Sequence, residues 1–80
     1  MRVEVRVYPK EGVLDPQGKA IAAALARLGH SGVRDVRAGK VFFLEVEGND
    51  RERAEAEAKR MAEELLANTV IEGFDVRVAP

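Results

Sequence analysis

The chain has 80 residues, with 13 basic and 14 acidic side chains and a formal net charge of -1. A single domain over residues 1–80 removes only roughly 60% of its unfolded surface from water, so we expect a thin core and association with other chains. The balanced charge argues against a dedicated nucleic-acid or membrane-surface protein, which normally carries a basic excess. With no cysteine and one histidine, the chain has little to offer a disulfide, a metal site or a histidine catalyst.

The N-terminal residues predict a strand with one buried face. Val3, Val5 and Val7 alternate with charged residues, which is the period of a half-buried strand. The same stretch has no apolar run that could serve as a signal peptide or a spanning helix. We therefore expect a cytoplasmic protein.

A helix is predicted to begin after this strand. Asp15 followed by Pro16 is typical of an N-cap with proline at the first helical position. Gly29 is the expected left-handed residue at the end of the helix. The predicted inward stripe consists of Ile21, Ala24, Leu25 and Leu28.

The middle of the chain predicts a hairpin of two strands, residues 33–37 and 40–47, joined by Ala38 and Gly39. Phe42, Leu44 and Val46 would form its buried face. The opposite face carries Val41 and Phe43, which suggests self-association, although scattered surface hydrophobes on a monomer remain an alternative.

The last part predicts a second helix and a closing strand. Asn49 or Asp50 would cap a helix that runs to about Ala67, and charged residues at four-residue steps would form its solvated face. Its expected inward residues are Ala54, Ala58, Met61 and Leu65. Phe74, Val76 and Val78 alternate with charged residues in the closing strand.

The order βαββαβ predicts an α+β fold. We expect a two-layer sandwich in which two helices cover one face of an antiparallel sheet, close to the ferredoxin-like arrangement. The sequence shows no convincing catalytic set. His30 lies in a Gly-His-Ser-Gly loop beside Ser31, and adjacency in sequence does not make a triad. No arginine-bearing anion loop follows the first strand, as a small acyl phosphate hydrolase would need.

Two irregular segments carry a resemblance to a known family. They are Pro9-Lys10 with Gly12 to Gly18, and Leu65 to Asn68 with Val70 to Glu72; Val36-Arg37 with Gly39-Lys40 lies between them. With these segments, the chain resembles nearly end to end the small PurS subunit of phosphoribosylformylglycinamidine synthase, the purine-pathway enzyme that many bacteria and archaea split into three chains.

The resemblance implies a noncatalytic role in a ligase complex of purine biosynthesis. In that family a glutaminase subunit releases ammonia, a large synthetase subunit uses ATP and magnesium, and the small subunit bridges the two and assists ammonia transfer. This chain would then bind no cofactor or metal, no nucleic acid and no membrane, and would form a homo-oligomer, a dimer or tetramer.

The resemblance also implies partner-binding residues on the irregular segments. Asp15 is explained about as well by helix capping, and Asn68 by a left-handed helix end. An ordinary solvated turn is the alternative at the basic hairpin tip. The implied set is Lys10, Gly12, Leu14, Asp15, Gln17 and Gly18 in the first segment, Arg37, Gly39 and Lys40 at the tip, and Asn68, Val70, Ile71 and Glu72 in the last.

A rival hypothesis from another class is a ferredoxin-like, oligomeric small-molecule sensor that binds its ligand at a dimer interface through the glycine-rich turns. It predicts a ligand that stabilises the isolated protein.

Overall fold

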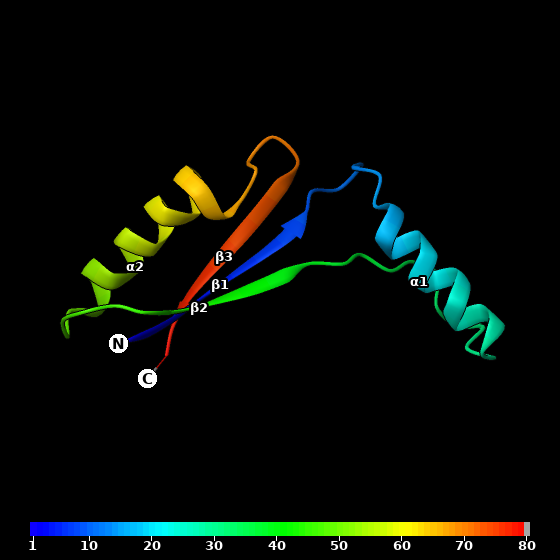
Figure 1. Cartoon of the computed structure of the whole chain (residues 1–80), viewed down its shortest axis with the longest axis horizontal. Coiled ribbons are helices and arrows are strands. Elements are labelled where there is room, and N and C mark those ends of the chain that lie inside the picture. The colour runs from blue at the N-terminus through cyan, green and yellow to red at the C-terminus, as the bar shows by residue number, and fades with distance from the viewer. Residues whose placement is uncertain (80) are drawn as a thin grey trace.

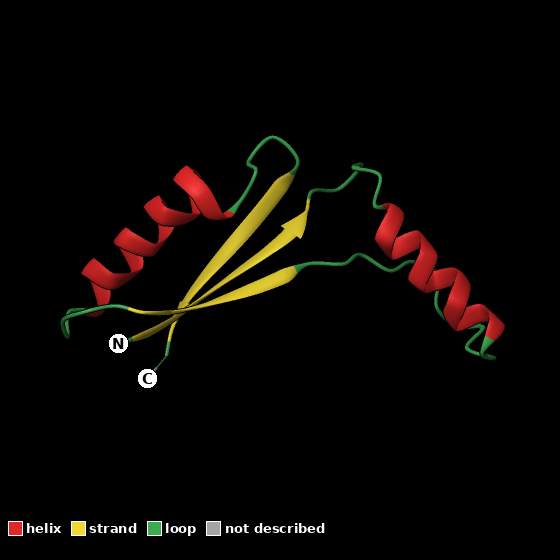
Figure 2. Ribbon diagram, in the orientation of Figure 1, coloured by secondary structure: helices red, strands yellow, loops and turns green. Residues whose placement is uncertain are grey.

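The computed structural model describes residues 1–79. Its elements are β1 (Arg2–Pro9), α1 (Pro16–Arg27), β2 (Lys40–Glu45), α2 (Arg51–Met61), a π-helical continuation η1 (Ala62–Leu66) and β3 (Glu72–Val78), as Figures 1 and 2 show. The strands form one antiparallel sheet in the order β2-β1-β3. The predicted α+β architecture, with helix layered on one face of an antiparallel sheet, is confirmed.

The core is built on the central strand. Val3, Val5 and Val7 of β1 are at most 1% exposed, and they point to the face that α2 covers. The register places Val5 opposite Phe42 of β2 and Val76 of β3, so one row of apolar side chains crosses the sheet. The predicted inner faces of these strands are therefore confirmed.

Small residues let α2 approach this row closely. Ala54, Ala58 and Ala62 recur at four-residue steps on one side of the helix and are all buried, because residues i and i+4 share a helix face. The helix begins at Asp50, whose carboxylate accepts the Arg53 amide at 3.2 Å, as capping requires.

Two of the residues expected on the inner side of α2 are on its outside. Met61 is 36% exposed and Leu65 is 82% exposed, so this part of the prediction is wrong. Met61 lies before the π-helical turn η1, and the inner position there is taken by Ala62, which follows Ala58 by four residues. Leu65 lies within η1, whose wider turn shifts the helix phase, and Ala67 is the buried residue near that end.

The charged residues predicted at four-residue steps on α2 make only some of the expected ion pairs with one another. Lys59 and Glu55 make an ion pair at 3.4 Å, while Arg51 donates to the carbonyl of Val78 at 3.1 Å and so ties the helix start to the end of β3. The exposed pair contributes little to stability because both side chains remain in water.

α1 begins and ends as predicted but does not cover the sheet. Asp15 is its N-cap with Pro16 at the first position, and Gly29 has φ +97°, as expected. Figure 1 shows α1 standing away from the sheet, and it makes no extensive contact with any strand or with α2. The expectation that both helices cover the same sheet is wrong for a single copy of the chain.

The detached helix makes the molecule elongated. Its radius of gyration is 15.8 Å, whereas a compact chain of this length has about 12 Å. Ile21 and Leu28 of the predicted inward stripe are 38% and 75% exposed.

The predicted strand over residues 33–37 is also wrong. This segment lies in neither helix nor strand, because it runs back beside the start of α1, where no strand of this chain is available to pair with it. β2 consequently has no hairpin partner and pairs with β1 instead.

The valine row generates a stability prediction. Val5→Ala removes two methyl groups from a fully buried site and should lower the free energy of unfolding by roughly 1.5–3 kcal/mol, including the cavity term. Chemical denaturation at one fixed protein concentration measures this, with Val41→Ala on the opposite, half-exposed side of the sheet as the control. Equal effects of the two changes would contradict the assigned faces.

Candidate functional site

The two irregular segments meet at one end of the sheet. The Lys10 amide donates to the Ile71 carbonyl at 2.9 Å, and the Lys10 ammonium donates to the Thr69 carbonyl at 2.6 Å. Residues that are 59 positions apart in the chain are thereby held together. The structure therefore joins the first and last segments that the sequence singled out.

The loop Asn68–Glu72, here called the Asn68 loop, is ordered by its own hydrogen bonds. The Asn68 side chain accepts the Val70 amide at 3.2 Å, and the Glu72 carboxylate accepts the Asn68 amide at 2.7 Å. The amides of Ile71 and Glu72 both donate to the Asn68 carbonyl. Within residues 1–79 only glycines have positive φ, so the left-handed conformation considered for Asn68 is wrong. Asn68 forms an Asx turn instead.

This internal bonding leaves apolar side chains facing water. Val70 is 81% exposed and Ile71 is 44% exposed, and Leu65 at the end of η1 is exposed beside them in sequence. A hollow of about 610 Å³ lies next to the loop, lined by Tyr8, Lys10, Glu63, Thr69, Glu72, Gly73 and Phe74. A rigid loop that presents unburied aliphatic side chains suits protein contact, because apolar surface is left wet only at a cost.

Residues 10–39, which carry α1 away from the sheet, are here called the arm, and Asp15 is near its base. Its carboxylate makes no capping hydrogen bond within α1 but accepts the Ala38 amide at 2.7 Å. This hydrogen bond is the main reason that the pKa of Asp15 lies below its ordinary value of 3.8, and the nearby amides of Gly18 and Gln17 and the charge of Arg37 lower it further.

The predicted basic hairpin tip does not exist as a tip, because the first strand of that hairpin is absent. Arg37 donates to the Pro9 carbonyl, and Gly39 packs against the backbone of Val7. Lys40 begins β2 with its ammonium 5.7 Å from the centre of the Phe42 ring. These residues lie along the chain that returns from α1 to the sheet.

The remaining predicted residues lie on the outgoing side of the arm. Gly12 has φ +82° and Leu14 is 66% exposed, next to an open hollow of about 500 Å³. Gln17 is exposed in the first turn of α1, whereas Gly18 is buried. Sequence reasoning gave no sign that Ala38 and Val36 contact this region. The one available signal was Gly18, since a glycine in the first turn of a helix often marks a close backbone approach.

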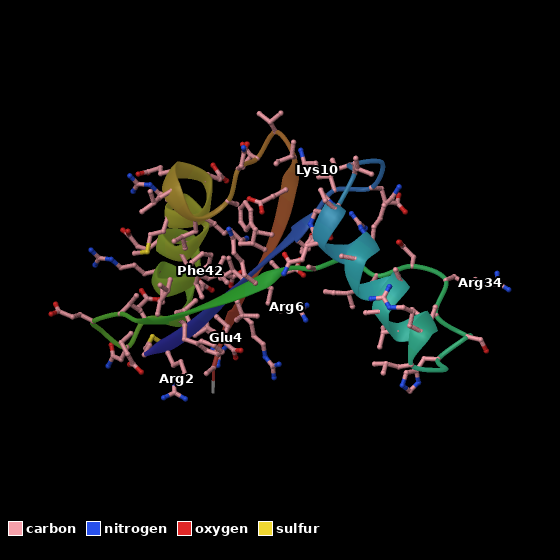
Figure 3. All side chains as sticks on the ribbon, turned by 45° about the vertical axis from the view of Figure 1, so that its right-hand side comes forward. Arg2, Glu4, Arg6, Lys10, Arg34 and Phe42 are labelled. Carbon is pink, nitrogen blue, oxygen red and sulfur yellow. The ribbon has the colours of Figure 1, made fainter. Side chains whose placement is uncertain are left out.

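The outer face of the sheet carries Val41 and Phe43, as predicted. Phe43 is 69% exposed and lies opposite Glu4 in the register. Figure 3 shows Arg2, Glu4 and Arg6 projecting on this side, away from α2, and Arg6 pairs with Asp75 at 3.2 Å. The exposed aromatic ring is thus surrounded by charged groups.

No catalytic constellation is assembled among residues 1–79. His30 is exposed directly after the turn that ends α1. The described part of the chain contains no group of three or more residues suited to hold a metal ion.

Among residues 1–79, no helix combines the length and apolar character needed to cross a bilayer.

Residues 2–80 match the family model described as PurS: Phosphoribosylformylglycinamidine (FGAM) synthase. The chain is 51% identical over 75 residues to phosphoribosylformylglycinamidine synthase subunit PurS of Mycobacterium leprae. The aligned stretch covers 94% of this chain and 91% of that relative. The chain is 47% identical to the same subunit of Bacillus subtilis over 77 residues, and this alignment covers 96% of this chain and 90% of the relative.

Solved structures give the same result for the fold. The C2 crystal form of B. subtilis PurS superposes with a TM-score of 0.85 at 46% identity, covering 99% of this chain and 98% of that one. A chain in the structure of PurLQS from Thermotoga maritima has a TM-score of 0.85 at 36% identity, covering 95% of this chain and 93% of that one.

The pKa of Asp15 is directly measurable. Because the folded-state pKa is lowered below the ordinary value of 3.8, the Ala38 contact contributes stability above that value and loses it as the pH falls through the folded pKa. Carboxyl carbon shifts followed by NMR should give Asp15 a midpoint below that of an exposed aspartate in the same spectrum. A midpoint equal to or above the ordinary value would contradict the contact.

Proposed function

This chain belongs to the PurS family, and from that premise we propose that it acts as the noncatalytic subunit of phosphoribosylformylglycinamidine synthase in purine biosynthesis. In this role it bridges a glutaminase subunit and a large synthetase subunit and assists the transfer of ammonia between them. The structure of PurLQS from T. maritima, which contains a similar chain, supports a multi-subunit assembly for such a chain. The ligase activity, with its ATP and magnesium, then belongs to the complex, and this chain works in the cytoplasm.

The proposal rests on the Asn68 loop, which hydrogen bonds from Lys10 hold in a fixed position. Ammonia released into bulk water would be protonated and lost, so two active sites that share it have to be held in register. A rigid adaptor can do this if its contact residues keep fixed positions. The bonds from Lys10 to Thr69 and Ile71 fix the loop, and Val70 remains free to contact a partner.

The proposed partner surface therefore has two parts. The Asn68 loop with Lys10 presents apolar side chains, and the outgoing side of the arm presents Leu14 and Gln17. The small-molecule sensor is not favoured, because the relatives named above are subunits of one synthase.

We also propose that the chain is a homo-oligomer in which α1 of one copy covers the sheet of another. The apolar stripe of α1 is wet in one copy, and Phe42 and Leu44 of β2 are only half-buried because α2 lies over β1 and β3. The half-covered face of β2 and the exposed stripe of α1 are both apolar, so each can cover the other. Val41 and Phe43 on the outer face provide a second candidate surface for higher assembly.

The proposed covering of one copy's sheet by α1 of another is here called arm exchange. It makes a specific prediction for the oligomer. Ile21→Glu should lower the molar mass measured by light scattering at micromolar concentration, because it places a charge in the covered stripe. Ala23→Glu on the opposite side of α1 is the matched control and should leave the mass unchanged. Phe43→Glu tests the outer surface in the same assay. If Ile21→Glu and Ala23→Glu behave alike, α1 is not an interface helix.

The adaptor role is tested by reconstitution. Mixing the three chains should give glutamine-dependent synthesis, and omitting this chain should abolish it while ammonia-dependent synthesis by the large subunit falls much less. A Val70→Asp and Ile71→Asp pair should mimic omission, since it puts charge on the exposed side of an ordered loop. Lys10→Ala should weaken coupling by releasing the loop.

The control for this assay is Arg53→Asp, which adds an acidic group on exposed helix surface away from the loop. Thermal midpoints of all variants should stay within a few degrees of the parent, as expected for surface changes of about 0.5 kcal/mol. Full glutamine-dependent activity in the double variant would reject the Asn68 loop as a partner contact.

A further inference from the structure

The two chain segments that connect α1 to the sheet are bonded to each other. The outgoing segment, residues 10–15, ends at Asp15, and the return segment, residues 30–39, reaches β2 through Gly39. The Asp15 carboxylate accepts the Ala38 amide at 2.7 Å, and the Arg37 guanidinium donates to the Pro9 carbonyl. The first hydrogen bond therefore joins the two segments to each other, and the second ties the return segment to the end of β1.

Two glycines permit the close approach that these bonds need. A Cβ placed on Gly18 would lie 1.9 Å from the Val36 carbonyl oxygen, and one on Gly39 would lie 2.5 Å from the Val7 carbonyl oxygen. The first approach brings the return segment against the start of α1, and the second brings it against the end of β1. Backbone fills both places, so a side chain there would force the segments apart.

The contacts are not explained by the needs of α1 itself. Asp15 stands at the N-cap, but its carboxylate makes its hydrogen bond to the Ala38 amide, and the first-turn amides of Gly18 and Gln17 affect it less than Ala38 does. Gly18 is a poor helix former in the helix that it occupies. Because Gly18 has no side chain, the Val36 carbonyl of the return segment can lie against the start of α1.

We propose that Asp15, Gly18, Arg37 and Ala38 form a lock, here called the arm lock, that fixes the direction of α1 relative to the sheet before the chains assemble. This inference rests on the arm exchange proposed above. An arm on two free segments could reach different neighbours and join copies into closed dimers or open chains, since exchange of a chain element permits both. An arm with one fixed direction selects one closed assembly.

The arm lock also gives internal roles to residues that the family resemblance assigned to partners. Asp15, Gly18 and Arg37 then act as positioning residues: they determine where Leu14, Gln17 and the stripe of α1 are presented, without touching a partner themselves.

The test measures the distance between α1 and the sheet within one chain. The protein has no cysteine, so Ala23→Cys on α1 and Arg77→Cys on β3 can carry spin labels without other changes. Labelled chain refolded with a large excess of unlabelled chain reports the distance within a single copy. The parent should give one narrow distribution by pulsed electron resonance.

Gly18→Ala should broaden that distribution and turn a single oligomer into a mixture in light scattering. Gly32→Ala is the matched control, because a Cβ there meets no atom within 4 Å and the residue lacks a positive φ. Alanine favours helix, so a loss of arm order in Gly18→Ala cannot come from helix propensity. Hydrogen exchange in α2 and β1 should be unchanged, which shows that the body of the protein is folded.

Asp15→Ala provides a second route if Gly18→Ala fails to fold, since it adds no volume. It should broaden the distribution in the same way, whereas Asp15→Asn keeps an oxygen acceptor for Ala38 and should stay close to the parent. A broad distribution in the parent, or a narrow one in both Gly18→Ala and Asp15→Ala, would overturn the arm lock. A parent that is monomeric with a narrow distribution would overturn arm exchange and leave the lock standing.

Discussion

The packing of three valines against three alanines is the contact on which the rest of this molecule depends. Val3, Val5 and Val7 are the largest fully buried side chains among residues 1–79, and Ala54, Ala58 and Ala62 bring α2 close enough to cover them. One helix can cover only part of a three-stranded sheet. The β2 side of the inner face is therefore left half-covered, and the helix that would complete the layer stands outside it.

This incomplete layer links the fold to the function. In the homo-oligomer proposed above, association stabilises a chain that cannot finish its own core and brings several copies of the Asn68 loop into one assembly. Each loop is held by bonds within its own chain, chiefly from Lys10 and Asn68. The adaptor can thus present partner contacts at fixed spacing without any catalytic group, as the bridging of two active sites requires.

The sequence was sufficient for most of what local pattern determines, with the left-handed conformation expected for Asn68 as an exception. The alternation of Val3, Val5 and Val7, the start of α1 at Asp15 and Pro16, and the turn at Gly29 were all predicted and are all present. The failures concern contacts between distant segments. Residues 33–37 have strand-like composition but no partner, and neither propensity nor periodicity shows where α1 packs. The π-helical turn, in which the Ala67 amide donates to the Ala62 carbonyl five residues earlier, is likewise absent from a regular helical period.

Hydrogen exchange of the α1 amides tests most directly whether α1 packs on another copy of the chain. A 12-residue helix without a packing surface is marginal in water, so bare α1 would exchange almost as fast as an unfolded segment. If α1 packs on a neighbouring copy, residues 20–27 are protected to nearly the same degree as α2 in the assembled protein and lose this protection in Ile21→Glu. Fast exchange throughout α1 in the parent, or strong protection in a chain shown to be monomeric, would contradict this packing.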